Sequence, residues 1–195
     1  MKSTLKNMVI VLCSITTITA AAVGYVYKIT KDPIAKTKED NISKSLQDVL
    51  PKYETLDEPV MMQVYPNDTE QIKIYKAKNG DQIVGYAVES YTSNGYAGVV
   101  KLLVGFDDKL VINKIAVISH GETPGLGAKI ANSEEPFVVQ FQGKDPGTFK
   151  LSVKADGGDV DAITASTITS KAYVDAVNRA YEGLKNKFMT NEKEN

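Results

Sequence analysis

The first feature of the chain is an uninterrupted apolar run near its N-terminus. Residues 7–27 carry no charge and consist mainly of Val, Ile, Leu, Ala and Thr. About 20 such residues are enough for a helix to cross the hydrocarbon core of a bilayer. Tyr25 and Tyr27 close the run, where aromatic side chains favour the membrane–water interface. The pattern therefore predicts a membrane-spanning helix.

The charges that flank this run are nearly balanced. Lys2 and Lys6 precede it, and Lys28 and Lys31 follow it, so positive charge encodes the orientation only weakly. An alternative interpretation is a cleaved signal peptide, because the small residues at 19–22 follow the apolar core as a cleavage site would. Either interpretation exports the rest of the chain, provided that the N-terminus stays inside.

The pattern of apolar positions changes twice after the charged stretch that follows the run. Ile42, Leu46, Val49 and Leu50 recur at helical spacing before Pro51, which predicts a short amphipathic helix. From residue 71 the period becomes that of strands, separated by turn sequences rich in Asn, Gly and Asp. The apolar positions of these strands are Ile72 and Ile74, then Ile83, Tyr86 and Val88, then Val99, Leu102 and Val104, and finally the β-branched stretch 110–118.

The C-terminal part of the chain returns to a helical period. Val174, Val177, Tyr181, Leu184 and Phe188 follow one another at spacings of three and four residues, which predicts an amphipathic helix that begins near residue 170. The sequence contains no internal repeat and no Pro- or Gly-rich linker that would divide the exported part. We therefore predict an α+β fold: one antiparallel sheet with flanking helices in a single domain.

Composition and charge exclude several classes of function. Lys and Arg number 23 and Asp and Glu 24, which gives a formal net charge of −1 and no basic surplus for binding a nucleic acid. Cys13 is the only cysteine, so the chain cannot form an intrachain disulfide or a thiolate metal site. His120 is the only histidine, and a single histidine needs no metal-binding or catalytic role.

A hydroxyl-rich segment from Asp161 to Ser170 precedes the predicted C-terminal helix. Taken alone, such a segment is typical of a strand end and a helix cap, with Thr169 or Ser170 as the capping residue. The whole segment, however, resembles the flavinylation signature of the FMN-binding domain family. In that alignment Thr167 is the acceptor for a covalently bound FMN.

The resemblance implies a route of attachment and a set of site residues. A separate flavin transferase takes FAD, moves the FMN half onto the Thr167 hydroxyl as a phosphoester, and releases AMP. Attack on phosphorus requires a hydroxyl, and small neighbours leave room for the transferase. The implied cofactor-binding residues of this segment are Thr167, Asp161, Thr164, Ser166 and Thr169. Ser166 departs from the family's usual motif and places a second hydroxyl beside the acceptor.

Two further motifs precede this segment. Glu122, Thr123, Gly125, Leu126 and Gly127 belong to a loop that follows a predicted strand, and the glycines let the backbone approach a planar ligand closely. The loop sequence Glu-Thr-Pro-Gly-Leu-Gly resembles that of the G subunit in Rnf-type complexes and of the C subunit in sodium-pumping NADH:quinone reductases. A plain turn is the alternative interpretation of Thr-Pro-Gly.

The remaining motif is the stretch 94–98, Asn-Gly-Tyr-Ala-Gly, which joins two predicted strands. It resembles the family's Gly-Tyr-x-Gly turn, in which Tyr96 would line the flavin side of the fold. A tight hairpin with an exposed tyrosine is an equally good interpretation. The resemblance spans the chain in order, from the anchor to the final helix, and the chain length favours the Rnf-type family.

The resemblance implies a division of the chain and a cellular location. Residues 1–31 would be the membrane anchor with its flanks, 32–70 the amphipathic helix and a connecting segment, 71–189 the FMN-binding domain, and 190–195 a polar tail. The chain would be a single-pass protein of the cytoplasmic membrane. Its FMN-binding domain would be extracytoplasmic and face the periplasm or the cell exterior.

The implied function is electron relay, in which the flavin carries electrons and the protein sets distance, solvent access and charge. Relay requires no general acid or base, so we expect no catalytic residue and no independent enzyme. The expected partners are membrane and iron–sulfur subunits that link ferredoxin and NAD to ion movement, a flavin transferase during maturation, and membrane lipid. The competing functions are a stand-alone exported flavoprotein and a non-redox membrane scaffold.

Overall fold

The computed structural model describes residues 4–66, 68 and 70–191, and the chain divides into two compact units at residue 41. The first unit consists of most of helix α1, which runs from Leu5 to Val49. By length and composition α1 is a candidate membrane span, with the side chains of its apolar stretch exposed. The predicted apolar run thus forms a helix of suitable length, whereas Lys2 lies outside the described residues.

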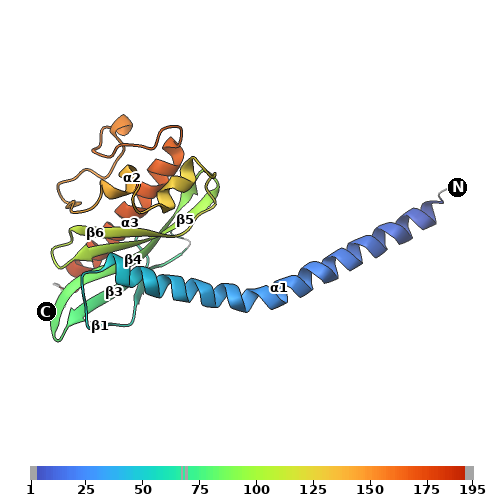
Figure 1. Ribbon diagram of the computed structural model, residues 1–195, viewed down its shortest axis with the longest axis horizontal. Helices are drawn as coiled ribbons and strands as arrows, with labels where there is room; N and C mark the ends of the chain where they lie inside the picture. The colour runs from blue at the N-terminus through green and yellow to red at the C-terminus, as the bar shows by residue number, and fades with distance from the viewer. Residues whose placement is uncertain (1–3, 67, 69, 192–195) are drawn as a thin grey trace. The chain divides into compact units, whose positions relative to one another are not determined.

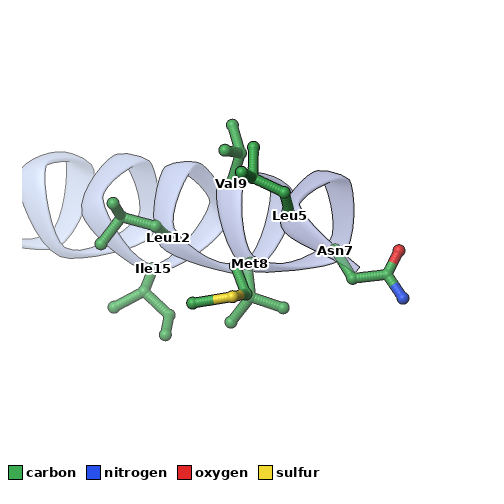
Figure 2. Close-up of a pocket in the computed structure, with 7 residues that line it drawn as sticks. Leu5, Asn7, Met8, Val9, Leu12 and Ile15 are labelled. Carbon is green, nitrogen blue, oxygen red and sulfur yellow. The ribbon is translucent and has the colours of Figure 1, made fainter. Parts of the chain in front are cut away.

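The start of α1 presents apolar side chains outward. Figure 2 shows Leu5, Met8, Leu12 and Ile15 projecting from the helix, and a hollow of about 910 Å³ lies between such side chains. The hollow is open helix surface lined by apolar groups. Its apolar composition suits contact with lipid acyl chains.

The second unit is built on a six-stranded sheet in which all named strands pair antiparallel (Figure 1). The path of the sheet is β1-β3-β4-β5-β6, and β2 also pairs with β3. The strands are β1 (Thr55–Leu56), β2 (Val60–Met62), β3 (Ile72–Asn79), β4 (Gln82–Gly95), β5 (Gly98–Asp107) and β6 (Ile112–Ser119). The predicted antiparallel sheet is confirmed, and β1 and β2 are strands that the apolar pattern did not predict.

Helix α3 (Thr167–Asn191) packs against one face of the sheet, mainly on β4 and β5 (Figure 1). Alternate residues of β4, such as Tyr86 and Val88, meet the buried α3 side chains Tyr173 and Val177 in one apolar cluster. Of the residues at the predicted helical spacing, Val174, Val177 and Leu184 are buried and Tyr181 packs partly buried against the same cluster. The side chain of Phe188 lies outside the described part of the structure. The helix begins at Thr167, three residues before the predicted start near Ser170.

The last turns of α1 belong to this second unit and cover the opposite face of the sheet. Leu46, Val49 and Leu50 are buried there together with Ala87 of β4. Gly105 of β5 makes this approach possible, because a Cβ atom built on it would lie 2.1 Å from the Val49 carbonyl oxygen. The amphipathic spacing predicted for 42–50 therefore describes a buried helix face.

The segment between β6 and α3 contains only short helices: η1 (Gly127–Ala131), α2 (Pro136–Val139) and η2 (Lys154–Asp156). Phe137 and Phe141 anchor this segment, since their rings lie 5.2 and 5.4 Å from the ring of Tyr173. Burial raises the pKa of the Tyr173 hydroxyl, which keeps this side chain neutral at every physiological pH. The segment is thus packed onto α3.

An ion pair between Asp68 and Arg179 fixes the stretch before β3 to α3. The guanidinium carbon of Arg179 also lies 4.9 Å from the ring centres of both Tyr65 and Tyr91. Burial by itself would raise the pKa of Asp68, but the hydrogen bond and charge of Arg179 and backbone N–H donors lower it overall. The carboxylate therefore stabilises the fold in its charged form.

We expect this pair to contribute to acid unfolding. Because the pKa of Asp68 is lower in the folded than in the unfolded state, its contribution is complete above the ordinary carboxyl pKa of about 3.9 and is lost as pH falls through the folded-state value. Asp68→Asn should flatten the fall in unfolding free energy between roughly pH 5 and pH 2. Exposed Asp81→Asn is the control. Equal acid slopes in Asp68→Asn and the original protein would contradict this account.

Candidate functional site

The candidate site is built on the first turn of α3. The Ser166 carbonyl accepts the first helical hydrogen bond, from the Ser170 N–H at 2.9 Å, so Thr167 is the first residue inside the helix. The N–H groups of the first residues of a helix have no partner within the helix. Here these are the N–H groups of Thr167, Ile168 and Thr169, which precede Ser170. They carry the positive end of the helix dipole and favour a negatively charged group.

The two adjacent hydroxyl residues at this start differ in exposure. Thr167 is exposed, whereas Ser166 is only 7% exposed. Ala165, just before them, has a φ of +60°, a left-handed conformation that turns the chain into the helix. Ser170 is used internally, because its hydroxyl donates to the Ser166 carbonyl and accepts from the Ile163 N–H. Among residues 166–170, Thr167 is therefore the one hydroxyl residue that is exposed.

A cavity of about 500 Å³ opens beside this turn. Three segments that are distant in the sequence contribute to its wall: the β4–β5 turn, the loop after β6, and the start of α3. The lining residues are Tyr96, Glu122, Thr123, Leu126, Gly127, Ala165, Ser166, Thr167, Ile168 and Thr169. Most of the site residues predicted from the sequence are thus brought to one place.

A buried carboxylate holds these three segments together. Glu122 is 4% exposed, and its Oε2 accepts a hydrogen bond from the hydroxyl of Thr169, which is also buried. Its Oε1 accepts a hydrogen bond of 3.1 Å from the N–H of Ala97 in the β4–β5 turn. The Glu122 N–H in turn donates to Nδ1 of His120 at 3.1 Å. His120 therefore has the structural hydrogen-bonding role that a lone histidine usually has.

Glycines make this close approach possible. A Cβ atom built on Gly127 would lie 2.6 Å from Oγ1 of Thr169 and 2.9 Å from Oε2 of Glu122, so a larger residue would push the pair apart. On Gly95 a Cβ atom would lie 2.8 Å from Oε1 of Glu122. Gly125 has open space around it and is needed for its backbone, since its φ is +76°.

Three predicted site residues do not share the cavity wall. Gly125 shapes the loop by its backbone, while Asp161 and Thr164 line a second cavity of about 280 Å³. The Asp161 side chain is 71% exposed and pairs with Lys154 at 2.7 Å. Conversely, the cavity wall includes Ala165 and Ile168, which were not among the predicted binding residues. Ile168 could have been found from its position, because it is an apolar residue at the start of the predicted helix but lies outside the apolar spacing that forms the buried face.

Comparison with known proteins assigns this domain to a class. Residues 95–182, which contain all three segments of the cavity wall, match the profile of the FMN-binding domain. The chain therefore contains an FMN-binding domain.

Relatives over most of the chain identify the family within that class. The chain is 34% identical to the G subunit of the ion-translocating oxidoreductase complex of Aliivibrio fischeri strain MJ11, over 92% of this chain and 90% of the relative. The corresponding values are 34%, 91% and 86% for the G subunit of Shewanella amazonensis, and 30%, 93% and 91% for that of Vibrio atlanticus. The chain belongs to the family of G subunits of ion-translocating oxidoreductase complexes.

The residues of the cavity fit an FMN group. Its volume lies within the range of roughly 300–1,000 Å³ typical of ligand cavities. Tyr96, Leu126 and Ile168 are 69%, 44% and 53% exposed and offer apolar surface to a planar ring. The N-terminal turn of α3 offers N–H groups and positive potential to a phosphate. An apolar wall and an anion-binding helix start are thus present side by side.

Proposed function

We propose that this chain carries FMN as a phosphoester on Thr167 and acts as the electron-relay component of a membrane-bound, ion-translocating oxidoreductase complex. The observation that carries the proposal is the exposed Thr167 hydroxyl at the first residue of α3, on the wall of a cavity that suits a flavin. Membership of the G-subunit family and the FMN-binding domain at 95–182 support it.

Bound FMN supplies the ability to accept and pass electrons, and the protein supplies position and environment. The N–H groups of the first turn of α3 would donate hydrogen bonds to a phosphate carried on Thr167. Tyr96, Leu126 and Ile168, which line the cavity, would provide apolar contacts for the ring. The Glu122–Thr169 hydrogen bond fixes the distance between the helix start and the loop after β6.

The proposed attachment requires a flavin transferase that uses FAD. Thr167 is the acceptor that the geometry favours, because Ser166 is nearly buried and Thr169 donates its hydroxyl to Glu122. Thr164 is exposed but lines the second cavity. A covalent link through Thr167 would keep the cofactor in place at any flavin concentration, which suits a permanent member of an electron-transfer chain.

The assembly is tested by purification from native membranes. If the chain is an electron-relay component, an affinity-tagged copy should bring polytopic and iron–sulfur subunits with it in a mild detergent, together with flavin. Recovery of the chain alone, with flavin, would favour a stand-alone flavoprotein. Recovery with membrane subunits but without flavin, from cells that contain the transferase, would favour a non-redox scaffold.

We further propose that α1 is retained as a membrane anchor and that the FMN-binding domain faces the periplasm or the cell exterior. Tyr25 and Tyr27 at the far end of the apolar run support retention. In a Cys13→Ser background, a cysteine at the exposed position 79 should react with a membrane-impermeant maleimide on intact cells whose outer barrier has been opened. Reaction only after the cytoplasmic membrane is breached would reverse the orientation. An N-terminus that begins after Ala22 would show cleavage instead.

A further inference from the structure

The segment that leads to Thr167 is held at its first residue by a side chain outside the motif. Gln140 bonds both polar groups of the Asp161 backbone: its Oε1 accepts from the Asp161 N–H at 2.8 Å, and its Nε2 donates to the Asp161 carbonyl at 2.9 Å. A pair of hydrogen bonds from one planar amide fixes both the position and the tilt of the backbone it binds. Asp161 is therefore oriented by Gln140.

Gln140 is itself held by the apolar core of the domain. Gln140 directly follows α2, and its Nε2 also donates to the Phe137 carbonyl at 2.9 Å. Phe137 is 5% exposed and packs edge-on against the ring of Tyr173 in α3. Through Phe137, the position of Gln140, and hence that of the Asp161 backbone, is fixed relative to α3, the helix that carries Thr167.

The other end of the segment is tied to α3 directly. The Ile163 N–H donates to Oγ of Ser170 at 2.9 Å, and this hydroxyl donates to the Ser166 carbonyl at 3.0 Å. Residues 161–166 are therefore fixed at both ends, and Thr167 follows at once. A segment held in this way is presented to a partner as a preformed shape, which lowers the entropic cost of binding.

The Asp161 carboxylate points to solvent and not into the cofactor cavity. It pairs with Lys154, but both side chains are more than half exposed, and an exposed pair contributes little and is readily exchanged for a new partner. Asp161, Thr164 and Gln140 line the second cavity, next to the acceptor along the chain. One side of the segment thus faces the cofactor cavity and the other is open to a docking protein.

We propose that Gln140 is a positioning residue for covalent attachment of FMN: by holding the Asp161 backbone, it fixes the segment that leads to the exposed Thr167 in one conformation for the transferase. This inference rests on the proposed attachment at Thr167. In that reaction Oγ of Thr167 forms a bond to the FMN-side phosphorus of FAD, and the bond from that phosphorus to the bridging oxygen breaks. AMP leaves with the bridging oxygen, the hydroxyl proton is released to solvent, and no electrons are transferred.

The test compares attachment rates of purified, flavin-free proteins with a flavin transferase and FAD. Gln140→Met keeps the length of the side chain but removes its three hydrogen bonds. We expect kcat/KM for the protein substrate to fall by on the order of 10- to 100-fold, as for a misplaced reacting group. The KM for FAD should not change. Gln140→Glu retains an acceptor for the Asp161 N–H and should give an intermediate rate.

Gln142→Met is the matched control, because Gln142 lies two residues further on with an exposed side chain, and it should load at the original rate. All variants are compared at a temperature at which circular dichroism shows them folded. The absorption spectrum of flavin attached to Gln140→Met should match that of the original protein, since Gln140 does not line the cofactor cavity.

Three results would overturn the proposal: an unchanged rate in folded Gln140→Met, an equal loss in Gln142→Met, or an altered flavin spectrum in the loaded Gln140→Met protein. Failure of the underlying attachment has a different signature. In that case the original protein would take up no FMN, or would carry it on a residue other than Thr167.

Discussion

A Thr167→Val protein is expected to fold normally and to carry no covalent FMN. The phosphoester needs a hydroxyl at this position, and valine keeps the branched shape without supplying one. Since Thr167 is exposed at the helix start, the change in unfolding free energy should stay within about 0.5 kcal/mol. After co-expression with a flavin transferase, the original protein should gain the mass of FMN less water, and Thr167→Val should not.

Thr164→Val is the control for this experiment. Thr164 is an exposed hydroxyl of the same segment, but it lines the second cavity and should not accept FMN. Its valine variant should therefore retain the full mass gain and the in-gel flavin fluorescence. A Thr167→Val protein that still fluoresces after denaturation would show that another residue is the acceptor.

Replacing Glu122 by alanine should produce the largest loss of stability at the site. The change leaves the buried Thr169 hydroxyl and the Ala97 N–H without their carboxylate partner. An unsatisfied buried group costs about 1–3 kcal/mol. Because Ala97 is exposed and its N–H can bond water instead, the free energy of unfolding should fall by about 1–3 kcal/mol, the cost of the buried Thr169 hydroxyl. Chemical denaturation of the detergent-solubilised protein, followed by circular dichroism, would measure the difference.

Two further variants make the Glu122 result specific. Glu122→Gln retains acceptor capacity and should lose less stability than Glu122→Ala. Glu134→Ala removes an exposed carboxylate from the same region and should be neutral within about 0.5 kcal/mol. If Glu122→Ala were as stable as Glu134→Ala, the carboxylate would not be what joins the loop after β6 to the start of α3.

Local sequence patterns were enough to predict the helices and strands whose buried residues recur at a regular spacing. The three- and four-residue spacing of Val174, Val177 and Leu184 predicted the buried face of α3, and the Asn-Gly turns marked the ends of β3 and β4. Strands β1 and β2 have two and three residues, too few to show a period. Tertiary pairing with β3 forms them, and no local signal records that pairing.

The start of α3 was placed three residues late for a related reason. Threonine and serine are typical of caps, so Thr167 to Thr169 resembled the approach to a helix more than its first turn. In the structure, Ser166 precedes the helix, and the hydroxyls of Thr169 and Ser170 bond Glu122 and the Ser166 carbonyl. These contacts permit the earlier start.

The site was predictable in its parts but not in its connections. Family resemblance pointed to Tyr96, Glu122 and Thr167, which the structure brings to one cavity. The hydrogen bond between Glu122 and Thr169 joins residues 47 positions apart, and the one between Gln140 and Asp161 joins residues 21 apart. No periodicity or spacing rule predicts such pairs, because they depend on how the finished segments pack.

The central claim, attachment of FMN to Thr167, is tested most directly by locating the modification in the original protein. Cleavage after lysine releases residues 155–171, which contain every hydroxyl of the segment. Fragment masses of this peptide, from protein made with a flavin transferase, should place the added FMN on Thr167. Location of the FMN on Thr164, Ser166 or Thr169, or an unmodified peptide from protein that retains flavin after denaturation, would contradict the account.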